Sequence, residues 1–222
     1  MTSVHDHTAV SIPVSDLVLR GDLRVPEGAE GLVLFAHGSG SSRLSPRNRY
    51  VAEILHEHSL GTLLADLLTT NEEREDQVTA HLRFDIGLLT ERLLAITEWL
   101  RAQPRAQAQA IGYFGASTGA AAALIAAARR PDLVKAVVSR GGRPDLAGSA
   151  LAGVQVPTLL IVGGADTTVL RLNEQARARM SAKTDLRIVP GATHLFEEPG
   201  ALAVVARMAA AWFRTYLIGS AG

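Results

Sequence analysis

The chain has 222 residues, which is enough for one sizeable hydrophobic core and short for two full domains. Its 47% apolar and 20% charged residues are typical of a soluble globular protein. Lys+Arg and Asp+Glu balance at 22 each, which leaves no overall basic field for nucleic acid or an anionic membrane, and the absence of cysteine excludes disulfides, thiolate metal sites and a cysteine nucleophile.

The N-terminal stretch "MTSVHDHTAV" is polar and lacks the apolar core of a signal peptide. Apolar runs such as "LVLFAHG" and "TLLIVGG" have the length of a strand, and no run approaches the length of a membrane span. We therefore expect a single cytoplasmic domain over residues 1–222. We expect it to act on a small molecule as a monomer or homodimer, with no nucleic-acid or membrane partner.

Short apolar runs alternate with longer amphipathic segments along the chain. "AVSIPV" and "LVLRGDLRVP" predict an opening hairpin, and "GLVLFAHG" predicts a buried strand followed by a helix over 48–58. "GTLLADLL" predicts the next strand, "NEEREDQ" a solvated acidic loop, and the spacing of leucine and isoleucine a long helix over 80–103. "AIGYFGAS", "VKAVVSRGG", "TLLIVGG" and "DLRIVPG" predict four more strands. Helices are expected directly after the first of these, over 168–180 and over 201–217.

Buried strands that alternate with helices indicate an α/β fold, a mostly parallel sheet with helices on both faces. Ligands in such sheets bind beyond the carboxyl ends of the strands, so the loops there are the place to look for chemistry. The connection over 143–157 has room for a short helix only. We therefore expect no substantial lid domain and an open pocket.

The stretch "GYFGASTGA" places Ser117 between Gly115 and Gly119, at the end of a predicted strand and the start of a predicted helix. A serine on such a turn has a strained backbone, and glycines on either side relieve the crowding around it. The spacing alone fits two interpretations equally well. Ser117 is either a nucleophile held on a sharp turn or a small residue where a helix packs closely on a sheet.

Two later loops supply partners for a serine nucleophile. "VGGAD" places Asp166 just past one strand, and "PGATH" places His194 just past the next. An imidazole takes the proton of a nucleophilic serine, and a carboxylate fixes the tautomer of that imidazole. The order Ser117, Asp166, His194 is the one found in α/β-hydrolases, and the other six histidines all precede the serine. The three residues are therefore the predicted catalytic set.

An oxyanion hole is expected from two backbone N–H groups, those of Thr118 and Ser39. Ser39 lies in the loop "FAHGSGSS", where Gly38 lets the chain turn away from the preceding strand. His37 in the same loop is expected to be structural, with its ring hydrogen-bonded to hold the loop in place.

These motifs resemble the α/β-hydrolase superfamily and, more narrowly, dienelactone hydrolase-like proteins. The resemblance covers nearly the whole chain, through "HGSGSS", "LLADLLT", "RFDI", "GASTG", "GGAD" and "GATH". It implies an α/β-hydrolase fold and a hydrolase that cleaves a small ester, lactone or related acyl substrate. Dienelactone hydrolase itself uses a cysteine nucleophile, and here that position is Ser117, which indicates serine hydrolase chemistry and leaves the substrate open.

Other classes of function fit less well. "GLVLFAHGSGSSR" resembles the start of a dinucleotide-binding motif, but the third glycine position is Arg43. His56 and His58 are two residues apart and face different sides of a helix, so they are not expected to share a zinc ion. No cofactor and no metal are expected. A non-enzymic ligand sensor, and an acyltransferase or peptidase that uses the same three residues, stay open as alternatives.

Four arginines follow the ends of predicted strands near Ser117, namely Arg43, Arg47, Arg140 and Arg143. Arginine suits two-pronged binding of a carboxylate or phosphate. Alternatively, these arginines are solvated or pair with Asp85, Glu72 or Glu73 to brace the loops. We expect at least one of them, Arg43 or Arg140 first, to contact an anionic group on the substrate.

Overall fold

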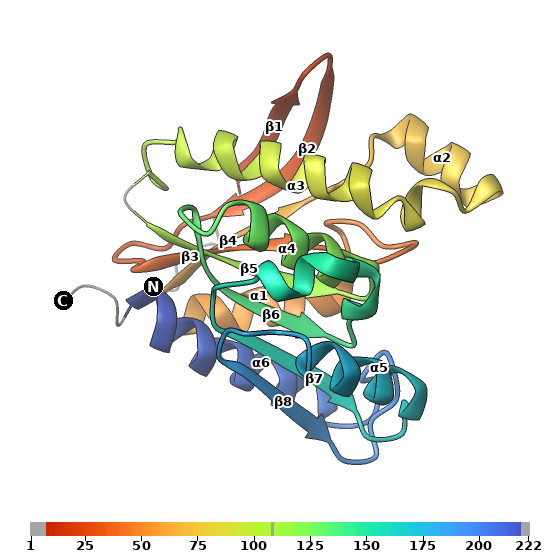
Figure 1. Ribbon diagram of the computed structural model, residues 1–222. Coiled ribbons are helices and arrows are strands. Elements are labelled where there is room, and N and C mark those ends of the chain that lie inside the picture. Colours follow the sequence, from red (N-terminus) through yellow and green to blue (C-terminus); the bar gives the residue numbers. More distant parts are fainter. Residues whose placement is uncertain (1–7, 108, 219–222) are drawn as a thin grey trace.

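The computed structural model describes residues 8–107 and 109–218, so the N-terminal residues 1–7 that entered the signal-peptide prediction lie outside it. The strands are β1 Thr8–Val14, β2 Leu17–Arg24, β3 Gly31–Ala36, β4 Leu60–Ala65, β5 Ala110–Ala116, β6 Val134–Arg140, β7 Thr158–Gly163 and β8 Thr184–Val189. They form an eight-stranded sheet in the order β1-β2-β4-β3-β5-β6-β7-β8 (Figure 1). β1 pairs antiparallel with β2, and β2 antiparallel with β4, while every later pair is parallel. The predicted opening hairpin and mostly parallel sheet are confirmed.

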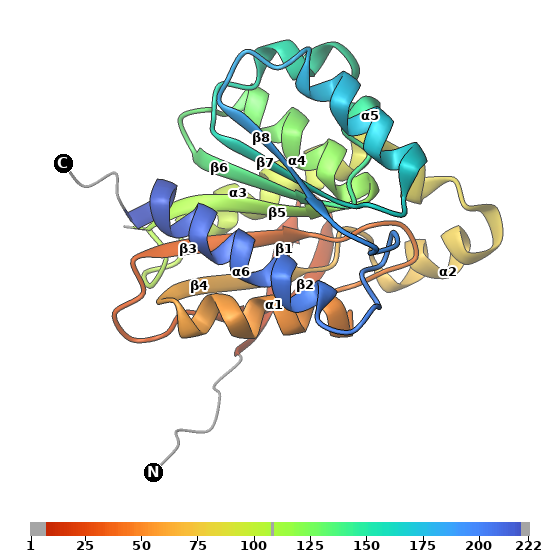
Figure 2. The same ribbon diagram turned by 90° about the horizontal axis from the view of Figure 1, so that it is seen from below.

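Helices cover both faces of the sheet (Figure 2). Their bounds are α1 Pro46–Glu57, α2 Thr70–Thr79, α3 Ile86–Arg101, α4 Thr118–Arg129, α5 Thr167–Arg177 and α6 Ala201–Phe213. α1 and α6 pack together on one face, and α3, α4 and α5 cover the other. The connection between β6 and β7 holds only the short 3₁₀ segment Pro144–Gly153, as predicted, and no lid domain stands there.

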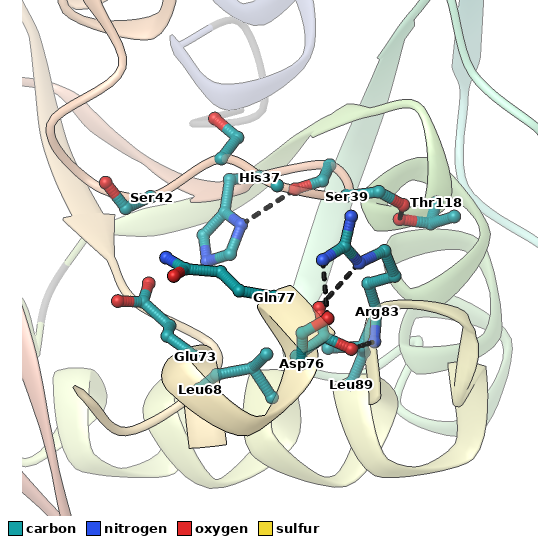
Figure 3. Close-up of a pocket in the computed structure, with 13 residues that line it drawn as sticks. His37, Ser39, Ser42, Leu68, Glu73, Asp76, Gln77, Arg83, Leu89 and Thr118 are labelled. Atoms are coloured by element: carbon teal, nitrogen blue, oxygen red, sulfur yellow. Dashed lines mark hydrogen bonds and ion pairs between the residues drawn. The ribbon is translucent and has the colours of Figure 1, made fainter. Parts of the chain in front are cut away.

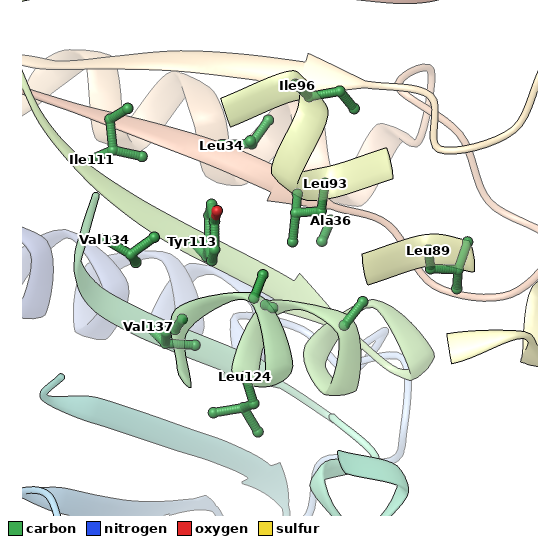
Figure 4. Packing of buried hydrophobic residues seen from close by; sticks show 14 of the residues in the cluster. Leu34, Ala36, Leu89, Leu93, Ile96, Ile111, Tyr113, Leu124, Val134 and Val137 are labelled. Carbon is green, nitrogen blue, oxygen red and sulfur yellow. The ribbon is translucent and has the colours of Figure 1, made fainter. Parts of the chain in front are cut away.

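The hydrophobic core lies in two layers, one on each side of the sheet. On the α3/α4 side, Leu34, Ile111 and Val137 from the strands pack against leucines of the two helices (Figure 4). Every residue of β3, β4 and β7 is buried, because these strands have helices on both faces. The central strands therefore form a rigid platform whose carboxyl ends carry the loops of interest.

The segment after β4 differs from the sequence prediction. The "NEEREDQ" stretch is a helix, α2, and the expected helix over 80–103 is divided into a 3₁₀ turn at Leu82–Phe84 and α3. α2 has no apolar stripe to reveal it. A capping box between Thr69 and Glu72 stabilises the start of this helix. An ion pair between Asp76 and Arg83 connects its later part to the following 3₁₀ turn. The predicted loop and the predicted uninterrupted helix are therefore both wrong.

The C-terminal helix corrects a second expectation. α6 continues into the π-helical turn Arg214–Ile218, and the 18 residues Ala201–Ile218 have a mean hydropathy of 1.3, long and apolar enough to cross a membrane by composition alone. The sequence prediction that no run approaches that length is wrong. In the structure, Val205, Ala209 and Phe213 are fully buried against the sheet. Packing on the sheet accounts for the apolar residues on the buried face, and 39% of the 18-residue stretch is buried.

Helix α4 approaches the sheet closely because its first turn is built from small residues. A Cβ on Gly119 would lie 2.2 Å from the carbonyl oxygen of Ala36 in β3, and a Cβ on Gly115 would lie 2.5 Å from the Cα of Ala120. Neither position has room for a side chain. The close-packing interpretation of this stretch is therefore correct for its two glycines, independently of the role of Ser117.

The Gly119→Ala variant tests this close approach. The added methyl group would push α4 away from β3, and we expect the free energy of unfolding to fall by about 2–3 kcal/mol. Gly153→Ala is the matched control, because a Cβ there would meet only Ala128 at 3.7 Å. Urea denaturation of both variants measures the difference, and equal stability of the two would contradict the packing described.

Candidate active site

Ser117 lies on a strained turn between β5 and α4. Its φ of 49° and ψ of −121° fall in a region that costs a non-glycine residue about 1–3 kcal/mol. The turn is held from both sides, since the Ser117 N–H donates to the Arg140 carbonyl (3.4 Å) and the Ser117 carbonyl accepts from Arg143 N–H (3.0 Å). The side chain does not cap α4. Strain retained at a polar residue in this way is characteristic of functional sites.

His194 and Asp166 form a close polar pair at the ends of the last two strands. His194 Nδ1 lies 2.7 Å from Asp166 Oδ2, and the other carboxylate oxygen caps α5 by accepting from Val169 N–H. The carboxylate is largely buried, whereas the imidazole side chain is 40% exposed. Because a carboxylate only accepts, Nδ1 carries the proton of the neutral ring and Nε2 is left able to take one.

The turn that follows β6 lies against both Ser117 and the histidine loop. The Arg140 carbonyl accepts from Ser117 N–H, and the next residue, Gly141, has a φ of 51°. A Cβ on Gly141 would lie 3.0 Å from the His194 carbonyl oxygen and 3.5 Å from its Cε1. The structure thus brings Ser117, Asp166 and His194 to the same edge of the sheet, and their catalytic roles remain predictions.

The loop after β3 packs directly on the Ser117 turn. A Cβ on Gly38 would lie 2.8 Å from the Cβ of Ser117, and the Ser39 hydroxyl lies 3.1 Å from the Thr118 hydroxyl. Within the described residues, neither Ser39 N–H nor Thr118 N–H donates a hydrogen bond. Two free N–H groups beside Ser117 are the arrangement that an oxyanion hole requires.

His37 braces this loop, as predicted. Its Nε2 accepts a hydrogen bond from Leu67 N–H at 3.0 Å, so its Nδ1 carries the proton and donates to the Gly38 carbonyl at 3.1 Å (Figure 3). Burial lowers the pKa of His37. The ring is therefore neutral and structural at neutral pH.

A cavity of about 420 Å³ opens beside the Ser39 loop, with α2 forming its opposite wall (Figure 3). Most of the lining is polar, including the serines of the loop together with Glu73 and Gln77, and the apolar part comes from Leu68 and Leu89. Burial and the negative charge of Asp66 raise the pKa of Glu73. The sequence analysis predicted a loop at "NEEREDQ" and so did not predict that α2 lines a cavity. The residues of α2 are mostly polar and show no apolar periodicity from which a helix could be predicted.

Three of the four arginines near the site pair with carboxylates; Arg47 does so through a single 3.3 Å contact with Glu197, and Arg43 and Arg143 are held more closely. Arg43 donates to Asp66 through both its backbone N–H and Nη1, each at 2.7 Å, and Arg143 donates twice to Asp145, at 2.9 and 2.8 Å. These partners are not the predicted Asp85, Glu72 or Glu73. Both arginines brace loops, so Arg43 is a weaker candidate for substrate binding than the sequence indicated.

Arg140 has the opposite environment. It is only 8% exposed, and its Nε and Nη1 are buried with no hydrogen-bond partner among the described residues. Burial, together with the positive charge of Arg47, lowers the pKa of Arg140 to about 10. In residues 8–107 and 109–218, no group of three His, Asp or Glu side chains is placed to hold a metal ion.

A mostly parallel sheet of this order, with a serine on a strained strand-to-helix turn and an Asp–His pair on later strand ends, defines an α/β-hydrolase fold. The model of the dienelactone hydrolase family matches residues 51–217, and the chain belongs to that family. Its structure is similar to that of dienelactone hydrolase from Anabaena variabilis, with a TM-score of 0.94 and 59% identity over 96% of this chain and 98% of that one.

More distant comparisons agree on the fold. Est1E from Butyrivibrio proteoclasticus is 17% identical with a TM-score of 0.77, over 92% of this chain and 97% of that one. A Mycobacterium tuberculosis protein named "Putative phosphoribosyl transferase" is 56% identical over 95% of this chain. The chain spans only 46% of the length of that relative. The name therefore describes a protein of which more than half has no counterpart here.

The pH dependence of stability tests the buried neutral state of His37. The unfolded chain protonates this ring below its ordinary pKa of about 6.5, whereas the folded protein resists doing so. The unfolded state then binds more protons, so the free energy of unfolding falls as the pH drops from 7.5 to 5.5. In His37→Gln this fall should be smaller. Identical pH dependence in urea titrations of both proteins would show that His37 is not held neutral.

Proposed function

We propose that this member of a hydrolase family is a serine hydrolase that cleaves a small ester, lactone or related acyl substrate through an acyl-enzyme. Family membership supports hydrolysis in general. The observation that carries the serine mechanism is the Asp166–His194 hydrogen bond of 2.7 Å on the same edge of the sheet as a serine held at a φ of 49°. A serine becomes nucleophilic only with an oriented base of this kind.

The residues of the site then have distinct roles in the reaction. His194 Nε2 takes the proton of Ser117 Oγ as the oxygen attacks the acyl carbonyl carbon, and the N–H groups of Ser39 and Thr118 hold the resulting oxyanion. His194 next gives that proton to the leaving oxygen, and the ester bond breaks to leave an acyl-Ser117. A water molecule, deprotonated by His194, then attacks the acyl carbon; the bond from that carbon to Ser117 Oγ breaks, His194 returns the proton to Oγ, and the acid is released. Asp166 orients the imidazole and stabilises its charged form.

The walls of the site favour a small, polar substrate. A cavity of about 420 Å³ beside the oxyanion loop suits a compact molecule, and only Leu68 and Leu89 among its lining side chains are large and apolar. A long acyl chain would find little apolar surface to bury. The Anabaena relative is named for a dienelactone, so a dienelactone is one lactone that a substrate screen should include.

Transfer of the acyl group to an acceptor other than water would use the same three residues, and so would peptide cleavage. Phosphoribosyl transfer, the reaction in the name of the Mycobacterium relative, needs no acyl-enzyme serine. Because this chain matches less than half of that protein, we assign the name no weight for the site around Ser117.

Replacement of Ser117 tests the mechanism. Ser117→Ala should lower kcat by roughly 10⁴–10⁶-fold on any ester that the wild type hydrolyses, because the nucleophile is lost while binding surfaces stay. Ser181→Ala, a change at an exposed position, should retain wild-type turnover. Near-normal esterase activity in Ser117→Ala would disprove the assignment.

A series of p-nitrophenyl esters tests the proposed size and openness of the site. We expect kcat/KM to be highest for acetyl and butyryl groups and to fall for decanoyl and longer chains. The connection between β6 and β7 carries only a short 3₁₀ segment, so no activation is expected at a lipid interface. A steep rise in activity above the micelle concentration of a long-chain ester would contradict this picture.

A further inference from the structure

The start of helix α1 and the end of strand β6 concentrate positive charge beside Ser117. We propose that Arg140 and Arg47 form an anion subsite that binds an oxyanionic group, a carboxylate or a phosphate, carried by the substrate. The assignment to a substrate rests on the proposed hydrolase function, whereas the binding of an anion does not.

The buried guanidinium of Arg140 is the first observation. Its Nε and Nη1 are shielded from solvent without a hydrogen bond, and no described carboxylate forms an ion pair with it. With its pKa at about 10, the group is charged at neutral pH. A buried charge without a partner is strongly unfavourable, so its retention calls for an anion that the protein itself does not supply.

Other buried or half-buried arginines of this protein form ion pairs with carboxylates. Arg92 is 7% exposed, close to the 8% of Arg140, and it donates to Glu72 at 2.8 Å. Arg83 binds Asp76 at 2.6 Å, and Arg43 binds Asp66 at 2.7 Å. The fold therefore pairs its enclosed guanidinium groups with carboxylates, and Arg140 departs from that pattern.

The surroundings of Arg140 add further positive charge. Arg47 is close enough for its charge to lower the pKa of Arg140, and its own Nε is buried without a partner. The only ion pair that Arg47 makes in the described chain is a 3.3 Å contact with Glu197, whose side chain is largely exposed. Arg47 belongs to the first turn of α1, which carries no acidic residue. The Ser45 side chain already caps Asn48 N–H, and Pro46 has no N–H, so the start of α1 adds only the positive end of the helix dipole to this region.

The position of the subsite links it to the reaction centre. Val138 packs in the core layer of α1 and α6, and Arg140 lies two residues further along the same strand, so its side chain is on that face of the sheet. Its carbonyl accepts the hydrogen bond from Ser117 N–H, and Gly141 beside it contacts His194.

The polar cavity is lined by the Ser39 loop, by Thr118 next to Ser117, and by α2 and Leu89 of α3 (Figure 3). A substrate whose acyl carbonyl sits at Ser117 would then extend in both directions. Its uncharged polar end would lie in the cavity, and its anionic end would lie against the two arginines. This arrangement predicts selection for esters that carry a negative charge on one side of the scissile bond.

Binding is tested first with inorganic phosphate and without any turnover. Millimolar phosphate in a low-salt buffer should raise the Tm of the wild type and of Ser117→Ala, and should not raise the Tm of Arg140→Gln. Arg49→Gln is the matched control, because Arg49 lies on α1 like Arg47 but pairs with Asp22. This variant should keep the wild-type shift in Tm. An unchanged Tm in both the wild type and Ser117→Ala, or an equal shift in Arg140→Gln, would overturn the subsite.

Catalysis is tested with three matched p-nitrophenyl esters, a hemisuccinate with a free carboxylate, its neutral methyl ester, and the phosphonate analogue. The wild type should prefer at least one anionic ester by ten- to a hundredfold in kcat/KM, as expected for one charged hydrogen-bonded pair. Arg140→Gln should lose most of this preference, and Arg49→Gln should keep it. Whichever anionic ester is hydrolysed with the higher kcat/KM shows whether the subsite prefers a carboxylate or a phosphate-like group.

Two results would count against the substrate assignment. One is equal activity of the wild type on neutral and anionic esters, even where phosphate raises the Tm. The other is full preference retained in both Arg140→Gln and Arg47→Gln. If the protein hydrolyses no ester, the proposed hydrolase function fails, and the phosphate shift in Ser117→Ala still decides the anion subsite. If Arg140→Gln does not fold, Arg47→Gln provides the same comparison.

Discussion

The close contact between the Ser117 turn and strand β3 is the constraint on which the site depends. Gly119 touches the Ala36 carbonyl, and Gly38 of the next loop touches the Ser117 side chain, so any Cβ at either position would force the layers apart. This contact holds Ser117 at a φ of 49° and brings the Ser39 loop beside Thr118. The strain at Ser117 persists because buried strands on both sides over-determine the turn.

The order of the parallel strands places Asp166 and His194 at the same edge of the sheet as Ser117. β5, β6, β7 and β8 are neighbours in the sheet, so the loops that carry Ser117, Arg140, Asp166 and His194 leave the same edge. The β6 turn connects them, since it accepts from Ser117 N–H and packs on the His194 ring. The backbone of the sheet thus determines where the site residues lie, and the side chain at each strand end supplies the functional group.

The sequence predicted most of this arrangement because buried parallel strands produce continuous apolar runs. The strand ends that carry Ser117, Asp166 and His194 could be read directly from those runs. α2 could not, because a helix of polar residues held by a capping box and by ion pairs has no apolar periodicity. The environments of the arginines were equally hidden, since neither the pairing of Arg43 with Asp66 nor the isolation of Arg140 follows from local sequence.

The proposed mechanism requires that Ser117 form a covalent bond during the reaction. A fluorophosphonate probe, followed by tryptic digestion and mass spectrometry, measures this most directly, because residues 106–129 form one tryptic peptide that contains Ser117. We expect stoichiometric labelling on Ser117, with labelling abolished in His194→Ala, where no base activates the hydroxyl. An unlabelled 106–129 peptide in the active wild-type enzyme, or label on another serine, would contradict the mechanism.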